Sequence, residues 1–307
     1  MRRTPAVPAF LACLSLAAVV QPAQEVSPAD RQKIESAIPQ KAAARAKQPR
    51  KLLVVTLNNR KRRIEGEHAS AIPAGNLALE LMGKRTGAYE AVFSNDMTMF
   101  SPERLKQFDA IFFNNTVGVL TDDPVQRKSL LDFVRNGKGF VGIHAAAATF
   151  CEFPKYDQFP EFGEMLGGYE DGGHPWRPNE TTTVKLDDPG NPINAAFGGK
   201  SFSIRGGVYQ FGHGHSREKL HVLLSVDVTK MDMDPKRSFL PERAIDKDFA
   251  ISWARMYGKG RVFYCSLGDT ADIFWNPSLL QHFLAGIQFT LGDLKADAQP
   301  SVKRQAR

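Results

Sequence analysis

Two histidines and one aspartate follow apolar runs in this chain, in positions where they could act in acid/base chemistry. His144 ends the run GKGFVGIH and precedes small residues, His68 follows KLLVVTL through a polar loop, and Asp269 follows YCSLG. A sharp turn after a strand lets backbone N–H groups approach a ligand, and an imidazole there can serve as acid, base or ligand. Asp269 could orient a histidine or activate water. The alternative is that these histidines are held by carbonyl groups of the core.

A third histidine lies in a loop rich in glycine and proline, YEDGGHPWRP. Beside His174, Trp176 offers a flat apolar face to a sugar ring, while Glu170 and Asp171 offer acceptors for hydroxyl groups. The same residues would be expected if Trp176 were a buried anchor for the loop, and the sequence leaves both interpretations open.

Other candidate sites have weaker sequence support. His213 and His215 have alternate spacing, but two histidines without further ligands indicate a metal site only weakly. Cys151 and Cys265 both follow or end expected strands, so a disulfide or a redox role is conceivable, although Cys265 has the context of a small buried hydrophobic residue. The chain contains no GxSxG, HExxH, Walker A or CxxC motif.

The elements that would position these residues alternate along the first half of the chain. Short apolar runs predict buried parallel strands, and apolar residues at helical spacing separate them, as in a flavodoxin-like, doubly wound sheet in an α/β protein. The second half is richer in strands and predicts an elaboration of one sheet edge. We expect strands at 51–57, 89–94, 109–114, 139–144, 181–186, 208–211, 222–226, 249–254 and 261–266, and helices at 74–85, 125–136 and 277–291.

Both ends of the chain are basic, whereas the part between them is acidic. Residues 24–63 carry a net charge of +8, residues 294–307 carry +3, and residues 64–293 carry −6. Residues 1–23 have the basic start and the short apolar run of a signal peptide, which predicts export to the periplasm or the outside and no stable membrane insertion. Residues 24–49 predict a linker or short helix. The basic residues do not form a structured face with stacking aromatic residues, which argues against a nucleic-acid partner.

Several motifs together resemble the ThuA-like (trehalose utilisation) family. They are GKGFVGIHAAAATF, FGEMLGGYEDGGHP, YQF followed by SREKLHVLLSVD, ISWARMYGKGRVFYCSLGD and GIQFTLGDL, and they cover residues 50–293. The resemblance implies a class I glutamine amidotransferase-like fold in which His144 occupies the place of the catalytic cysteine, so glutaminase chemistry is not expected. It also implies that His68, His144 and His174 are family histidines, and that Tyr209 and Arg217 contribute to substrate binding.

Two positions depart from the pattern that the resemblance implies. The family commonly has an acidic pair before the YQF tyrosine, where this chain has Gly206 and Gly207, and a histidine after SLG, where this chain has Asp269. The resemblance therefore leaves two functions open. One is an enzyme that acts on a small carbohydrate, glycoside or oxidised sugar by histidine-centred hydrolysis, isomerisation or elimination, with or without a divalent metal. The other is a non-catalytic carbohydrate-binding or assembly protein.

Overall fold

A computed structural model of the chain describes residues 25–59, 68–152, 155–212 and 214–301. The expected signal peptide at 1–23 lies outside the described residues, as do His213 and the end of the basic tail. In the described part of the chain, no helix is long and apolar enough to cross a membrane.

The protein is built on one nine-stranded sheet with the order β3-β1-β4-β6-β11-β10-β9-β7-β8. The first five strands in this order are parallel, and each of the remaining neighbours is antiparallel. The strands are β1 (Lys51–Val55), β3 (Glu90–Phe93), β4 (Ala110–Asn114), β6 (Gly139–Ile143), β7 (Thr181–Leu186), β8 (Phe202–Arg205), β9 (His221–Val226), β10 (Ala250–Tyr257) and β11 (Gly260–Cys265). A separate two-stranded ladder joins β2 (Asn58–Asn59) to β5 (Val117–Gly118).

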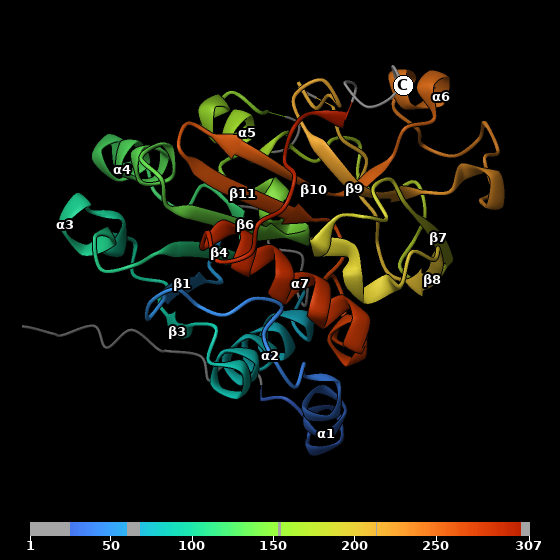
Figure 1. Cartoon of the computed structure of the whole chain (residues 1–307). Helices are drawn as coiled ribbons and strands as arrows, with labels where there is room; N and C mark the ends of the chain where they lie inside the picture. Colours follow the sequence, from blue (N-terminus) through green and yellow to red (C-terminus); the bar gives the residue numbers. More distant parts are fainter. Residues whose placement is uncertain (1–24, 60–67, 153–154, 213, 302–307) are drawn as a thin grey trace, which may run out of the picture.

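Helices cover both faces of the sheet (Figure 1). One face packs against α1 (Pro28–Ala37), α2 (Ala71–Thr86) and α7 (Pro277–Thr290), and the other against α3 (Pro102–Leu105), α4 (Pro124–Arg135) and α5 (Pro160–Leu166). Alternate residues of β1 divide between the two cores: Leu52 and Val54 belong to the first, and Leu53 and Val55 to the second. The remaining helices are α6 (Pro241–Asp246) and the 3-10 helices η1 (Met97–Phe100), η2 (His144–Ala148), η3 (Pro192–Phe197), η4 (Val228–Lys230) and η5 (Ala271–Trp275).

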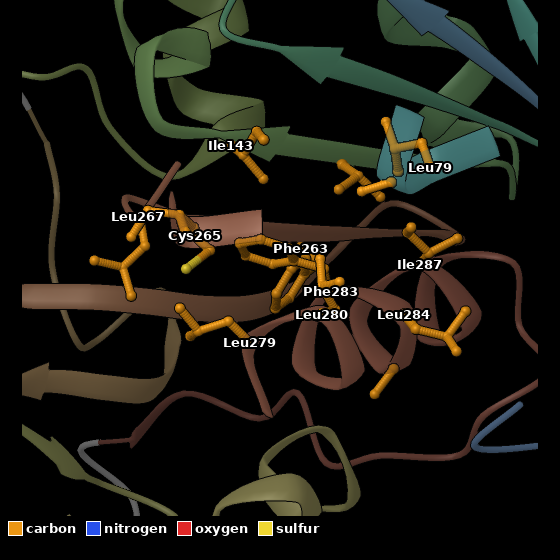
Figure 2. Close-up of a cluster of buried hydrophobic side chains, with 14 of the residues drawn as sticks. Leu79, Ile143, Phe263, Cys265, Leu267, Leu279, Leu280, Phe283, Leu284 and Ile287 are labelled. Carbon is orange, nitrogen blue, oxygen red and sulfur yellow. The ribbon is translucent and has the colours of Figure 1, made fainter. Parts of the chain in front are cut away.

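Helix α7 packs along the middle of the sheet, on β11 and β6. Its N-cap Asn276 accepts hydrogen bonds from the backbone N–H groups of Ser278 and Leu279, and Pro277 begins the first turn. Figure 2 shows Leu280, Phe283, Leu284 and Ile287 of α7 beside Phe263, with Leu79 and Ile143 on the opposite side of the cluster. Burial of this apolar stripe fixes the central strands whose ends carry the candidate site.

The two ends of the described chain pack on the same domain. Ile34 and Ile38 are buried in the core on the α2 and α7 side, so the short helix α1 within residues 25–49 packs on the domain. At the other end, the backbone N–H of Ser301 donates to Leu220 O at 2.9 Å, and His221 Nδ1 lies 2.6 Å from Gln299 O.

The expected elements agree with the structure except at one segment. Residues 208–211 do not form a strand of the sheet; instead, Val208 and Phe211 form isolated bridges with Trp176 and Glu170. The segment is apolar like a strand, but its partner is the loop that contains His174. This pairing brings Tyr209 and His174 together.

Candidate active site

Polar residues follow four of the parallel strands and lie at the carboxyl edge of the sheet. His68 follows β1, Asn115 follows β4, His144 follows β6, and Asp269 follows β11. Strand order reverses beside β1, because β3 lies on one side of it and β4 on the other. Ligands of open α/β sheets bind outside the carboxyl ends of strands at such a reversal.

His144 occupies a strained turn between β6 and η2. Its φ is 43°, in the left-handed region that residues with a Cβ seldom adopt, and the four alanines of η2 behind it are buried. A hydrogen bond holds the turn, because Tyr264 Oη donates to His144 O at 2.7 Å, and Gly268 lies nearby, where a Cβ would be 3.5 Å from His144 Cβ. The small residues of η2 and the sharp turn from β6 into η2 give the geometry expected of a nucleophile elbow.

The His144 ring is surrounded by three other rings. It stacks on Tyr209 with centroids 4.4 Å apart and on His174 at 5.5 Å, and His68 approaches edge-on at 4.8 Å. Tyr209 also contacts His174, with a centroid distance of 4.3 Å. The structure therefore brings together His68, His144, His174 and Tyr209 in one cluster.

The hydrogen bonds of His144 define which nitrogen is basic. Nδ1 lies 2.8 Å from Ser266 O, and a carbonyl oxygen can only accept, so Nδ1 carries the proton. Nε2 is buried and has no hydrogen-bond partner among the described residues. Burial, followed by the proximity of His68 and His174, holds the pKa of His144 well below its usual value of 6.5. His144 is therefore neutral at pH 7 and presents a lone pair on Nε2.

Asp269 and His174 both lie next to Gly207. Asp269 Oδ2 accepts a hydrogen bond from Gly207 N at 2.6 Å, and a Cβ on Gly207 would lie 2.7 Å from that oxygen and 2.9 Å from His174 Nδ1. Burial raises the pKa of Asp269 to about 6 and lowers that of His174 to about 4. Asp269 Oδ1 and His174 Nδ1 are buried without a hydrogen-bond partner in the described part of the structure.

Trp176 is not available as a platform for a sugar. It is fully buried, packs against Phe239 and Phe249, and donates from Nε1 to Asp232 O at 3.0 Å. Its role is to anchor the loop that carries His174. Of the neighbouring acidic pair, Glu170 is buried with its backbone N–H bonded to Ala147 O of η2, and Asp171 accepts from Tyr156 Oη at 3.1 Å.

Arg217 and His215 have structural contacts instead of the expected site contacts. Arg217 forms a two-bond ion pair with Asp248 at 2.6 and 2.7 Å and reaches Asp187 at 2.9 Å, which uses its guanidinium in bonds to protein carboxylates. His215 Nδ1 lies 3.0 Å from Gly167 O, and its ring contacts Phe211 and Trp253. Burial lowers the pKa of His215 to about 4.

Neither a disulfide nor a compact metal site is formed by the described residues. Neither Cys151 nor Cys265 is in a disulfide, and they belong to cores on opposite faces of the sheet, which keeps their thiols apart. Burial raises the pKa of Cys265 to about 12, consistent with an inert buried thiol. Within the described ranges, no group of three or more His, Cys, Asp or Glu side chains could hold a metal ion.

Sequence reasoning missed Ser266 and Asn115. Ser266 contacts His144 through its carbonyl, which every residue type has, so this contact gave no signal in the sequence, and its hydroxyl accepts from Tyr209 N at 3.3 Å. Asn115 is fully buried next to the end of β4 and donates to Gly268 O at 2.9 Å. The sequence offered a signal for Asn115, because it directly follows the buried strand β4, and polar residues after such strands lie at the carboxyl edge where ligands bind. The same rule had identified His144 after β6.

Comparisons with known proteins agree on the fold. The family model described as "ThuA: Trehalose utilisation" matches residues 54–290. A putative ThuA-like protein from Bacteroides uniformis is 20% identical, with a TM-score of 0.63 over 84% of this chain and 98% of that one. A second, from Parabacteroides merdae, is 14% identical, with a TM-score of 0.52 over 83% of this chain and 99% of that one. No curated protein matched.

Proposed function

Because this chain belongs to the ThuA (trehalose utilisation) family, we propose that it acts on a carbohydrate, glycoside or oxidised sugar by acid/base chemistry centred on His144. One observation carries the proposal. The Nδ1–H of His144 is fixed by Ser266 O, and its Nε2 lone pair is buried and unbonded among the described residues. A neutral imidazole held in one tautomer is prepared to accept a proton.

The neighbouring groups supply the rest of the proposed chemistry. His144 Nε2 would accept a proton from a sugar hydroxyl or from a carbon next to a carbonyl, and Asp269, with its pKa near 6, can return a proton to the leaving or product oxygen. His174 and His68 line the same place, and Tyr209 holds the His144 ring by stacking. Hydrolysis, isomerisation and elimination are all compatible with these two proton transfers.

A carbohydrate-binding protein without catalysis is the second candidate. Gly206 and Gly207, in place of the acidic pair common in the family, favour it. Against it, the Asp269 carboxyl fills the space beside these glycines, within 3.4 Å of a Cβ placed on Gly206. The site therefore still contains one carboxyl group, which Asp269 supplies in place of the acidic pair. For this reason we favour the enzyme.

We also propose the finer fold assignment and the export of the chain. The order β3-β1-β4-β6-β11 of the parallel strands supports a flavodoxin-like arrangement of the glutamine amidotransferase-like type. With His144 at the elbow and Cys151 buried beyond it, glutaminase chemistry is not expected. The composition of residues 1–23 supports export to the periplasm or the outside. N-terminal sequencing of the protein from its own host tests this, and a retained Met1 would contradict it.

The test of the function compares the wild type with His144→Ala. Each protein is incubated with trehalose, alkyl glucosides and their keto derivatives, and products are identified by mass spectrometry. We expect turnover by the wild type and a loss of about 100-fold or more in the variant, the usual contribution of a general base. His282→Gln is the matched control, because His282 is also a buried neutral histidine but is bonded to Ile193 O and Ser252 Oγ in the α7 core. Saturable binding without product would favour the second candidate, and equal turnover by His144→Ala would exclude His144 as the base.

A further inference from the structure

Asn115 and His144 are the residues that follow two adjacent strands of the sheet. The parallel register pairs Asn114 of β4 with Ile143 of β6, so the next residues of the two strands, Asn115 and His144, stand opposite each other at the carboxyl edge. Both have left-handed backbones, with φ of 55° and 43°. Two adjacent strands thus end in strained residues with polar side chains, and strain of this kind is concentrated at functional sites.

The amide orientation of Asn115 is fixed by its two N–H groups. Nδ2 donates to Gly268 O at 2.9 Å and to Asn114 Oδ1 at 3.1 Å. Asn114 is itself held, because its Nδ2 donates to Ile72 O and to Asn76 Oδ1. Both donors of Asn115 are therefore used, and only the acceptor Oδ1 remains. That oxygen is buried, and no described residue donates to it.

The same contacts tie Asn115 to the histidine cluster. Gly268, whose carbonyl accepts the hydrogen bond from the Asn115 amide, immediately precedes Asp269, and a Cβ on Gly268 would lie 3.5 Å from His144 Cβ. Asn115 Oδ1 and His144 Nε2 are thus two unbonded acceptors on neighbouring strand ends. A buried acceptor without a donor is costly, and a ligand that brings hydroxyl donors would satisfy both.

We propose that Asn115 is a substrate-binding residue, whose Oδ1 accepts a hydrogen bond from one hydroxyl of a polyhydroxylated sugar while His144 Nε2 accepts from another. This inference rests on the proposed function, and it adds that one hydroxyl group of the sugar is recognised by Asn115. A carbonyl oxygen of an oxidised sugar has no proton to donate, so that group must lie away from Asn115 Oδ1. Because its orientation is fixed, the Asn115 amide is specific for a hydroxyl group at one position of the sugar.

Asn194 provides a matched control for this proposal. It is also fully buried, its Nδ2 donates to the backbone carbonyls of Asp188 and Leu223, both at 2.9 Å, and its Oδ1 has no partner within the described residues. It lies in η3, beside β9 and away from the carboxyl edge that holds His144. Replacing either asparagine by leucine removes the same groups, but only Asn115 is expected to affect a ligand.

The experiment measures sugar binding by titration calorimetry on the full chain. The probes are methyl α-glucoside, trehalose and the 2-, 3-, 4- and 6-deoxy forms of the glucoside. For the wild type, we expect removal of one particular hydroxyl to weaken binding about tenfold. Asn115→Leu should bind the parent sugar about tenfold more weakly and show no further loss with that deoxy sugar, whereas Asn194→Leu should bind as the wild type does.

The possible failures can be told apart. If Asn115→Leu retains wild-type affinity while His144→Ala loses it, Asn115 has only a structural role, and the proposed function stands. If no probe binds the wild type, this inference is overturned, whereas turnover of the keto derivatives would still support the proposed function. If Asn115→Leu does not fold, the deoxy sugars still test the inference on the wild type, because equal affinity of the wild type for all of them would overturn it without any variant.

Discussion

The buried carboxyl of Asp269 should make the free energy of unfolding depend on pH in a defined direction. Burial raises the pKa of Asp269 from an ordinary value of 3.8 to about 6. The folded protein therefore binds this proton more tightly than the unfolded chain does. The stability contributed by Asp269 is fully present below pH 3.8 and is lost as the pH rises through 6.

The magnitude follows from the size of the shift. A difference of roughly two pKa units, at about 1.4 kcal/mol per unit, amounts to about 3 kcal/mol of stability lost above pH 7. Asp269→Asn removes the ionisation, and its side-chain oxygen can still accept from Gly207 N. We expect the variant to match the wild type near pH 4 and to exceed it in free energy of unfolding by up to about 3 kcal/mol at pH 8.

The assay is urea unfolding of both proteins at intervals from pH 4 to pH 8. Buried histidines such as His215 and His282, with pKa values of about 4, destabilise both proteins as the pH falls below 6.5, so the difference between the two isolates Asp269. Asp248→Asn is a control of opposite sign: although burial alone would raise the pKa of Asp248, its pairing with Arg217 leaves it below the ordinary value. A difference between wild type and Asp269→Asn that does not change with pH would refute the reasoning.

Two further predictions concern the packing around the site. Gly207→Ala places a Cβ 2.7 Å from Asp269 Oδ2, so we expect a loss of about 1–3 kcal/mol in unfolding free energy together with reduced activity. Gly190→Ala is the control, because its Cβ would lie 3.8 Å from the nearest neighbour, and it should change neither property. Equal stability of the two variants in urea would contradict this prediction. Trp176→Phe removes the bond to Asp232 O and part of a buried ring, and we expect a loss of about 2–4 kcal/mol with the affinity for sugars in the folded protein unchanged. A selective loss of affinity at full stability would restore Trp176 as a binding residue.

The sequence predicted the central strands well because their signal is local. Strands buried on both faces consist mainly of apolar residues, as in KLLVV and AIFFN, and these two were located within two residues of their observed bounds. Residues 208–211 carry the same local signal, but they pair with a loop rather than with the sheet. The identity of a pairing partner is a tertiary property, and the composition of a short segment does not contain it.

The candidate site was predicted in part for a similar reason. His68, His144, His174 and Asp269 follow strand ends or lie in an adjacent loop, and the rule for carboxyl edges identifies such positions. Trp176 could not be assigned from the sequence, since an aromatic residue in a loop fits a binding face and a buried anchor equally well. Its burial follows from packing against Phe239 and Phe249, which lie more than sixty positions along the chain.

The position of β11 in the sheet has a consequence for the order in which the chain is synthesised. Strand β6, complete at residue 143, pairs on one side with β4 but on the other with β11, which ends only at residue 265. Until those later residues leave the ribosome, a fully apolar strand has an open edge, and open edges of this kind invite pairing with other chains. Incomplete chains of this protein that end between residues 143 and 265 therefore leave this edge of β6 without its partner strand.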